Sequence, residues 1–274
     1  MLKRTVFFVS DQTGITAETM GHSLMTQFDG IEFRQVTVPF ISTVDKAIEA
    51  VRKIDLVAAQ EGVRPVVFST LVQEDVRNVV RGSTGFFLDF FDPFLAPLAG
   101  ELKTPSSHIA GRTHRTTDTH AYAMRIDATN FALANDDGSV VHDYERADVV
   151  LVGVSRSGKT PTCLYLAMQY GIFAANYPLT DDDLESRKLP RALEAYERKL
   201  FGLTIRPDRL QQIRNERRPD SRYSSAAQVA FEVRAAESLF ERHGIPVLDA
   251  TEVSIEEISI RILDRTGIER RLRP

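Results

Sequence analysis

The sequence has little cysteine and no long apolar run. Cys163 is the single cysteine among 274 residues, so no disulfide can form within the chain, as is typical of proteins from a reducing compartment. No stretch approaches the roughly 20 consecutive apolar residues that span a bilayer. The apolar run Val6–Val9 is too short for the core of an export signal. We therefore expect a soluble, cytoplasmic protein with no membrane partner.

An excess of positive charge is also missing. Lys plus Arg number 34 and Asp plus Glu 38, which gives a formal net charge of −4. A mildly acidic chain has no overall attraction to nucleic acid or anionic membranes, so we expect no nucleic-acid partner and only local anion binding. The histidines show no compact metal-ligand spacing. His114 is the one of interest, although an exposed loop histidine is the default interpretation.

One motif stands out against this background. Residues 153–160 read Gly-Val-Ser-Arg-Ser-Gly-Lys-Thr and match the phosphate-binding pattern G-x-x-x-x-G-K-[ST]. Glycines at both ends let the backbone bend so that successive N–H groups face phosphate oxygens. Lys159 then places its charge against the terminal phosphate, and the Thr160 hydroxyl can hold Mg²⁺. The predicted nucleotide site comprises Gly153, Val154, Ser155, Arg156, Ser157, Gly158, Lys159 and Thr160.

The sequence around the motif favours this interpretation. Residues 148–152 form a short, mostly β-branched apolar run that predicts a buried strand. Apolar residues at helical spacing follow Pro161, and Gly171 is a plausible helix end. The alternative is a glycine turn between a strand and a core helix. On that helix, Cys163 is expected to be a buried thiol rather than a nucleophile.

Strands and helices alternate along most of the chain, which predicts an α/β fold with a mainly parallel sheet. Before the motif, we expect strands at 5–9, 33–38 and 65–69, and helices at 15–28, about 44–56 and 72–82. After it, we expect strands at 172–177, 201–205 and 245–249, and helices at 189–199, 208–217, 225–243 and 254–266. The predicted organisation is an N-terminal α/β unit (1–103), a connecting polar loop and helix (104–146), and a P-loop kinase-like domain (147–274).

The region between the two alternating parts has a different composition. Five phenylalanines lie close together at 86, 87, 90, 91 and 94, which indicates a core plug or, alternatively, an oligomer contact. Residues 104–120 are almost wholly polar and predict a linker or functional loop. Residues 121–133 are helix-like, and 135–138 carry a strong turn signal.

Secondary motifs narrow the class of phosphate-loop protein. The Asn-Lys-x-Asp motif of GTP switches, the Leu-Ser-Gly-Gly-Gln signature of transport ATPases and the G-x-G-x-x-G dinucleotide fingerprint are all absent. A small kinase-like domain remains, in which positioned charges do most of the catalysis. Arg156 is one such charge within the loop. A basic run over 206–222 offers more, because Arg214 can share a helix face with Arg217 or Arg218. That face could clamp phosphate, or it could be solvated and paired with Glu216 and Asp220.

Carboxylates for Mg²⁺ or proton transfer are harder to assign. Asp249 ends an apolar strand, as a Walker-B aspartate does, but it could equally cap the next helix. Asp181–Asp183 could form a metal-side loop or a turn. Asp11, in a loop after the first predicted strand, and Asp249 are the candidates for a general base.

Several segments together resemble the pyruvate, phosphate/water dikinase regulatory proteins. The segment 149–162 resembles that family, as do residues 164–167 and 174–178. So do Val9–Asp11 with Thr16–Glu18, Tyr122 with Arg125 and Ile126, residues 136–138, 199–204 and 213–218. The likeness covers nearly the whole chain. Gly158 and Asn176–Pro178 are closer to the branch acting on phosphoenolpyruvate synthase.

The resemblance implies two opposing activities. Family members use ADP to phosphorylate a threonine of a dikinase, and they use inorganic phosphate to remove that group as pyrophosphate. The loop would then hold the ADP phosphates, with Lys159 on the transferred β-phosphate and Thr160 on Mg²⁺. The resemblance and the phenylalanine cluster make a homodimer plausible. Two alternatives stay open, namely a small-molecule kinase using ATP and a non-enzymatic nucleotide-sensing adaptor.

Overall fold

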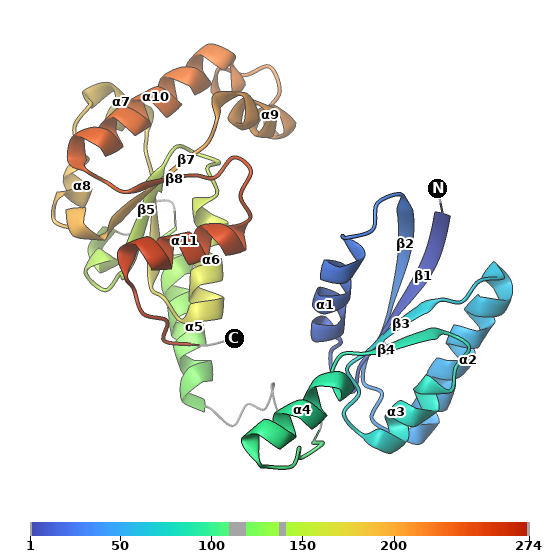
Figure 1. Cartoon of the computed structure of the whole chain (residues 1–274). Coiled ribbons are helices and arrows are strands. Elements are labelled where there is room, and N and C mark those ends of the chain that lie inside the picture. The colour runs from blue at the N-terminus through green and yellow to red at the C-terminus, as the bar shows by residue number, and fades with distance from the viewer. Residues whose placement is uncertain (1, 110–118, 137–140, 273–274) are drawn as a thin grey trace. The chain divides into compact units, whose positions relative to one another are not determined.

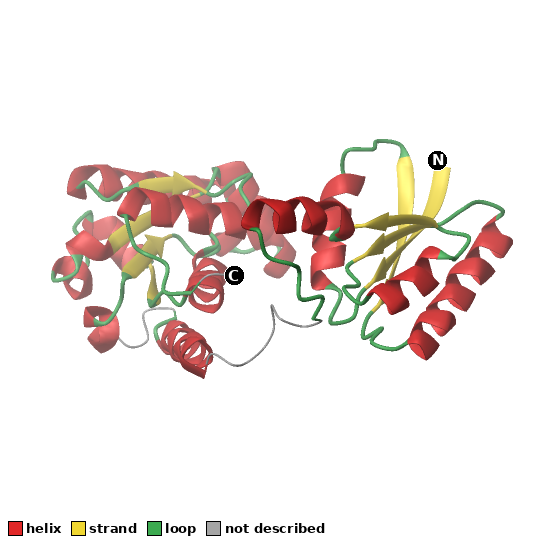
Figure 2. Ribbon diagram, turned by 60° about the horizontal axis from the view of Figure 1, so that its bottom comes forward, coloured by secondary structure: helices red, strands yellow, loops and turns green. Residues whose placement is uncertain are grey.

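The computed structural model describes residues 2–109, 119–136 and 141–272 and contains two compact units (Figure 1). The first is Met1–Arg115 and the second is Thr116–Pro274. Each has its own four-stranded sheet. Figure 2 shows helices packed against the strands of both sheets. The α/β class with parallel sheets, predicted from the sequence, is confirmed.

The first unit is a parallel sheet with the strand order β2-β1-β3-β4. Its elements are β1 (Leu2–Val9), α1 (Ile15–Met25), β2 (Ile31–Val38), α2 (Val44–Glu61), β3 (Val66–Ser69), α3 (Glu74–Arg81), β4 (Phe86–Asp89) and α4 (Asp92–Leu102). Along β1, which pairs with β2 from Leu2↔Ile31 to Val9↔Val38, alternate side chains enter different cores. Val6 and Phe8 pack with residues of α1, and Phe7 and Val9 pack with residues of α2 and α3.

The second unit repeats this strand order as β6-β5-β7-β8, again with all pairs parallel. Its strands are β5 (Val149–Gly153), β6 (Ala174–Pro178), β7 (Leu200–Thr204) and β8 (Val247–Asp249). Its helices are α5 (Thr119–Ala134), α6 (Lys159–Tyr170), α7 (Asp181–Ser186), α8 (Arg191–Glu194), α9 (Pro207–Arg217), α10 (Ala226–His243) and α11 (Ile255–Thr266). The short 3-10 turns are η2 (Val141–Glu145), η3 (Glu197–Lys199) and η4 (Arg222–Ser224).

One large core holds the second unit together. Strand β5 is central and is buried along its whole length, as the apolar run predicts. Helix α6 packs on β5 and β6, with α5 and α11 beside it, while α10 packs on β7 next to α7 and α9 (Figure 1). Because α5 contacts α6 and β6, the helix predicted in the connecting segment 104–146 packs with the second unit.

The phenylalanine-rich region differs from prediction. Instead of a single core plug, it forms strand β4 and helix α4, neither of which was predicted. Phe90 is buried and stacks on Phe68 with ring centroids 5.1 Å apart, so the core interpretation is confirmed there. It is wrong for Phe86 and Phe94, which are 49% and 60% exposed. Pro97 lies inside α4, which is why the pattern did not read as a helix.

Two predictions for the segments after β6 also need correction. The helix predicted at 189–199 is two short pieces, α8 and η3. Asp181–Asp183 is neither a metal loop nor a simple turn, because it begins α7. There the Thr180 side chain accepts from the Asp183 N–H, and the Asp183 carboxylate accepts from the Thr180 N–H.

Two further findings concern segments singled out from the sequence. His114, Asp137, Gly138 and most of the polar segment 104–120 lie outside the described residues. Within the described part of the chain, no helix is long and apolar enough to cross a membrane.

Candidate active site

The glycine loop, residues 153–160, joins the carboxyl end of β5 to the start of α6. Gly153 lies where β5 and β7 approach, and a Cβ atom there would collide with the Leu203 carbonyl oxygen. Gly158 is the N-cap of α6 with φ 91° and ψ 8°, a left-handed conformation that favours glycine. No side chain caps this helix end. The first N–H groups of α6 are therefore not covered by a capping side chain, as an anion-binding helix terminus requires.

Two side chains of the loop turn inward. Lys159 is only 5% exposed, and its Nζ donates a 2.9 Å hydrogen bond to the Val154 carbonyl oxygen. Ser157 is buried, and its hydroxyl has no hydrogen-bond partner among the described residues. Arg156 holds φ 75°, an uncommon value for a residue with a side chain. Strained backbone of this kind is found where a loop is shaped for binding.

A polar cluster stands beside the loop at Thr160. Its hydroxyl donates a 2.8 Å hydrogen bond to the Asp136 carboxylate. The Asn176 amide donates to the same carboxylate and, over 3.0 Å, to the Thr160 hydroxyl. Asp136 is held in place by the neighbouring backbone, because the Asn176 N–H donates to the Asn135 carbonyl oxygen. The cluster thus joins the end of α5, strand β6 and helix α6.

A hydroxyl oxygen and a carboxylate oxygen, both of the type that can bind Mg²⁺, therefore lie side by side. Mg²⁺ is usually held by one or two carboxylate or hydroxyl oxygens, with phosphates and water completing the shell. The Thr160 hydroxyl and the Asp136 carboxylate fit this donor set. Asn176 Oδ1 is buried without a hydrogen-bond partner in the described part of the chain. No group of three His, Cys, Asp or Glu side chains suited to a metal occurs among the described residues.

A cavity of about 280 Å³ opens in front of the loop. Its charged lining residues, Arg156, Lys159 and Arg217, are all cationic. Ile213, Pro161 and Pro178 supply its apolar wall. Converging cations next to a helix N-terminus stabilise a phosphate chain.

Arg214 lies behind the loop rather than in the cavity. It is fully buried, and its guanidinium lies 4.2 Å from the centroid of the Tyr223 ring. Nη2 donates to Glu232 over 2.6 Å and to the Ser155 carbonyl oxygen over 3.1 Å, and Nη1 donates to the Tyr223 carbonyl oxygen over 3.0 Å. The Ser155 hydroxyl lies 3.0 Å from the Tyr223 hydroxyl. These contacts fix the back of the loop to α9, η4 and α10.

The basic run therefore differs from both interpretations offered by the sequence. Arg214 pairs with Glu232, not with Glu216 or Asp220, and it is neither solvated nor in the cavity. Arg217, one turn away from Ile213, does line the cavity. Spacing along α9 indicated a shared face, but it could not reveal that α10 supplies a buried carboxylate.

The other predicted carboxylates make different contacts. Asp249 is exposed at the end of the edge strand β8, where its carboxylate accepts from the N–H and hydroxyl of Thr251. Asp11 lies in the first unit and is 6% exposed. Its carboxylate accepts from the Val72 N–H over 3.3 Å, and burial raises its pKa. Asp136 was missed as a site residue, although the turn signal at 135–138 and the family resemblance of residues 136–138 both pointed to this segment.

Cys163 is buried in α6, as expected from its apolar surroundings. Its thiol donates a 3.4 Å hydrogen bond to the Ala175 carbonyl oxygen, and burial raises its pKa. A buried thiol whose pKa is raised holds little thiolate at neutral pH, which fits the expectation of a buried structural thiol.

Comparison with known proteins gives a consistent result over the whole length. A family model described as Kinase/pyrophosphorylase matches residues 6–263. A protein of Alkalilimnicola ehrlichii is 54% identical over 270 residues, which cover 98% of each chain. One of Pseudomonas putida is 55% identical over 272 residues, covering 99% of this chain and 100% of the relative. Both carry the name "Putative phosphoenolpyruvate synthase regulatory protein".

The match includes both units and the glycine loop between β5 and α6. It agrees with the resemblance recognised in the sequence, and identities above one half over the full length leave no ambiguity about common descent. This chain belongs to the kinase/pyrophosphorylase family.

Proposed function

We propose that this chain regulates phosphoenolpyruvate synthase by reversible phosphorylation. In one direction it would act as an ADP-dependent threonine kinase that inactivates its target. In the other it would act as a phosphate-dependent phosphorylase that restores activity and forms pyrophosphate. Family membership and the names of the relatives support phosphotransfer and this partner. The single observation that carries the chemistry is the cationic cavity in front of the glycine loop.

In the kinase direction, the groups that line this cavity would have distinct roles. The α6 N-terminus and the loop N–H groups would bind the ADP phosphates, with Lys159 moving from the Val154 carbonyl to the β-phosphate. The threonine oxygen of the target attacks the β-phosphorus, and the bond from that phosphorus to the bridging oxygen breaks. AMP leaves, and the hydroxyl proton passes to a base. Arg156 and Arg217 would stabilise the negative charge on the transferred group.

The phosphorylase direction can use the same anion site. Inorganic phosphate would occupy the position of the departed nucleotide phosphate. One of its oxygens attacks the phosphorus of phosphothreonine, the bond to the threonine oxygen breaks, and pyrophosphate forms while the threonine oxygen takes a proton. A single site can serve both directions because each step places two phosphoryl groups next to each other. No separate catalytic apparatus is then required.

Magnesium would supply positive charge to the phosphate oxygens in both directions. The residues that would hold it are Thr160, through its hydroxyl, and Asp136, through its carboxylate. Asn176 donates to both oxygens and orients them. In this arrangement Asp136 replaces Asp249 as the metal-side carboxylate, since Asp249 is engaged with Thr251.

One assay separates this function from its alternatives. The chain is incubated with phosphoenolpyruvate synthase and ADP labelled in the β-phosphate, and labelled threonine is sought on the target. Labelled threonine supports the proposal. Turnover of a metabolite with ATP and no protein partner would indicate a small-molecule kinase. Binding of ADP without any transfer would indicate a nucleotide-sensing adaptor.

Lys159→Ala tests the shared site. Both directions should be lost, because the same positive charge serves ADP and inorganic phosphate. Retained phosphorolysis together with a lost kinase activity would show that two anion sites operate. Lys188→Ala, at an exposed position of the same unit, is the matched control and should retain both activities.

The general base requires its own pair of variants. Asp11→Asn and Asp249→Asn are compared in kinase turnover against wild type. Loss in one variant alone supports that group as the one that receives the threonine proton. Full activity in both rejects both candidates.

A further inference from the structure

The first unit repeats the framework of the glycine loop. In both units the central strand pairs with the next strand on one side and with the third strand on the other. Strand β1 ends at Val9 and α1 begins at Ile15, while β5 ends at Gly153 and α6 begins at Lys159. The two intervening loops, residues 10–14 and 154–158, therefore have the same length. Ligands of such sheets bind where the strand order reverses, at the carboxyl ends of the strands.

The turn into the helix is also repeated. Gly14 is the N-cap of α1 with φ 87° and ψ −6°, close to the values of Gly158, and no side chain caps α1. A Cβ atom on Gly14 would lie 2.9 Å from Thr37 Cγ2, so both the conformation and the space favour glycine. Thr16 occupies the position that corresponds to Thr160, counting from the glycine. Ile15 stands where the second unit has Lys159.

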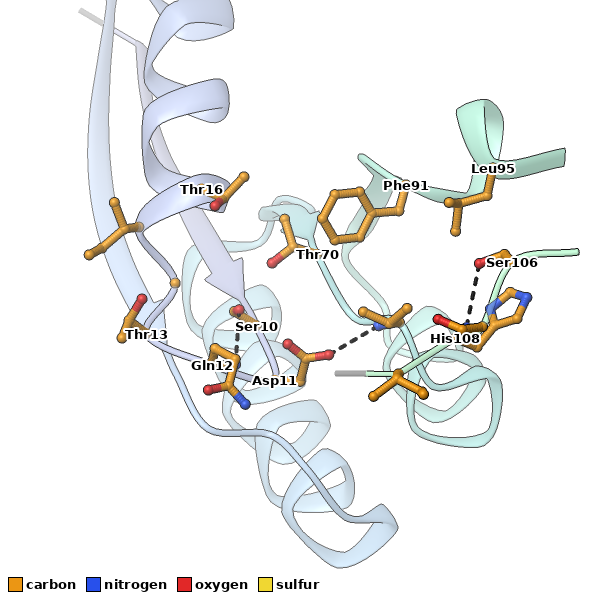
Figure 3. Close-up of a pocket in the computed structure, with 15 residues that line it drawn as sticks. Ser10, Asp11, Gln12, Thr13, Thr16, Thr70, Phe91, Leu95, Ser106 and His108 are labelled. Atoms are coloured by element: carbon orange, nitrogen blue, oxygen red, sulfur yellow. Dashed lines mark hydrogen bonds between the residues drawn. The ribbon is translucent and has the colours of Figure 1, made fainter. Parts of the chain in front are cut away.

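A cavity of about 230 Å³ opens at this helix end (Figure 3). Side chains with hydroxyl groups line much of it, among them Ser10, Thr13, Thr16 and Ser106. Figure 3 shows that Phe91 and Leu95, from the start of α4, close the opposite wall. The cavity therefore combines a helix N-terminus with several hydroxyl donors, a set that binds oxyanions.

Thr70 gives independent support for a ligand. It follows β3, and its N–H donates to the Val9 carbonyl oxygen, which fixes it next to the start of the loop. The residue is only 3% exposed and lines the cavity. Its hydroxyl has no hydrogen-bond partner among the described residues. A buried hydroxyl left without a partner is costly, so a ligand in the cavity is its natural acceptor.

Asp11 indicates which oxyanion fits. Asp11 lines the cavity, and the residue as a whole is only 6% exposed. An ionised carboxylate can only accept hydrogen bonds. It therefore repels an oxyanion without a proton and accepts a hydrogen bond from one that carries a proton. At a pH of about 8, phosphate monoesters have lost their last proton. Sulfate also has none, whereas inorganic phosphate keeps one.

We propose that the first unit holds a second anion site, formed by Ser10–Gly14, the α1 N-terminus and Thr70, that binds inorganic phosphate as the protonated hydrogenphosphate. The α1 N–H groups and the Thr70 hydroxyl donate to its unprotonated oxygens, and its P–OH group donates to Asp11. The site lacks a lysine, so it suits a small anion rather than a nucleotide diphosphate. This inference does not depend on the activities proposed above.

The test uses the full chain with Lys159→Ala, which weakens the anion site of the second unit. Calorimetric titration at a pH of about 8 compares phosphate, sulfate and AMP as probes. Phosphate should bind, and sulfate and AMP should bind at least about tenfold more weakly. Equal binding of phosphate and sulfate, or no phosphate binding at all, would overturn the proposal.

Variants in the Lys159→Ala background locate the site. Thr70→Val preserves the shape and should weaken phosphate binding by roughly tenfold, and Thr70→Ser should restore it. Asp11→Asn replaces an acceptor by a group that also donates, so it should let sulfate bind about as well as phosphate. Unchanged anion preference in Asp11→Asn would refute the role of the carboxylate. Thermal unfolding of each variant shows that it is folded.

A crystal of the full chain soaked in phosphate gives the direct answer. Density for an anion at the α1 N-terminus, within hydrogen-bond distance of Thr70 Oγ1 and Asp11, supports the proposal. Density only at the glycine loop would overturn it.

Discussion

The guanidinium group of Arg214 donates a 3.1 Å hydrogen bond to the backbone carbonyl oxygen of Ser155, inside the glycine loop. The same nitrogen donates to Glu232 on α10 over 2.6 Å. A buried, planar guanidinium holds its acceptors in a more rigid geometry than the flexible ammonium of a lysine does. Arg214 is thus a positioning residue that connects the loop to α10 and is not among the residues that line the cavity.

Replacing Arg214 by Met should destabilise the second unit by about 3–5 kcal/mol, because Glu232 is left as an uncompensated buried charge. The double variant Arg214→Met with Glu232→Leu should regain most of that stability. Both variants should have a higher KM for ADP than wild type, because both lack the hydrogen bond from Arg214 to the Ser155 carbonyl oxygen. Calorimetric unfolding and kinase kinetics measure the two effects separately. A wild-type KM in the double variant would show that the contact with Ser155 does not position the loop.

Asp136→Asn should raise the Mg²⁺ concentration needed for half-maximal activity by about tenfold or more, because a neutral amide is a much weaker ligand for this cation. The fold should be retained, since the amide can still accept from the Thr160 hydroxyl. The measurement is kinase rate as a function of Mg²⁺ concentration.

Asp127→Asn provides the matched control. Asp127 lies on α5, is exposed and forms a surface ion pair of 3.5 Å with Arg146. Its removal should change neither the Mg²⁺ requirement nor, beyond about 1 kcal/mol, the stability. An unchanged Mg²⁺ requirement in Asp136→Asn would remove Asp136 from the proposed metal site.

Much of the fold was predictable from local patterns. The strand at β5, the helix at α6 and the Gly158 turn each have a strong signal within a few residues. The failures have a common cause. Strand β4 and helix α4 were missed because prolines and closely spaced phenylalanines conceal the period, and only pairing with β3 identifies Phe86–Asp89 as a strand. Contacts between distant segments overrode local preference there.

The candidate site was predictable only where it is continuous in sequence. Residues 153–160 were recognised because the motif is local. Asp136 and Arg214 were not assigned their positions, because the first depends on the backbone bond from Asn176 and the second on a carboxylate from α10. Neither contact has a sequence spacing that distinguishes it from chance. Partners across a fold therefore need a structure.

Gly202→Ala should destabilise the second unit by about 1–3 kcal/mol, because a Cβ atom there would lie 2.9 Å from the Phe240 ring in a tightly packed core. Gly100→Ala should instead stabilise the first unit by about 0.5–1 kcal/mol, since it lies within α4 with open space around it. Scanning calorimetry of the two variants measures both. Loss of stability in Gly100→Ala, or none in Gly202→Ala, would contradict these assignments.

Asp11→Asn should increase the free energy of unfolding at neutral pH. Burial raises the pKa of the Asp11 carboxyl above its ordinary value of 3.8, so the folded state binds its proton more tightly than the unfolded state. The charge therefore destabilises the fold once the pH is above the raised pKa, and this cost disappears as the pH falls through the ordinary value. Urea unfolding at pH values of about 7 and about 4 should show a gain that shrinks toward acid.

Asp29→Asn, at an exposed position of the same unit, should stay within about 0.5 kcal/mol of wild type at both pH values. A loss of stability in Asp11→Asn at a pH of about 7 that becomes smaller at a pH of about 4 would contradict the prediction. It would mean that the hydrogen bond from the Val72 N–H outweighs the cost of burying the carboxylate.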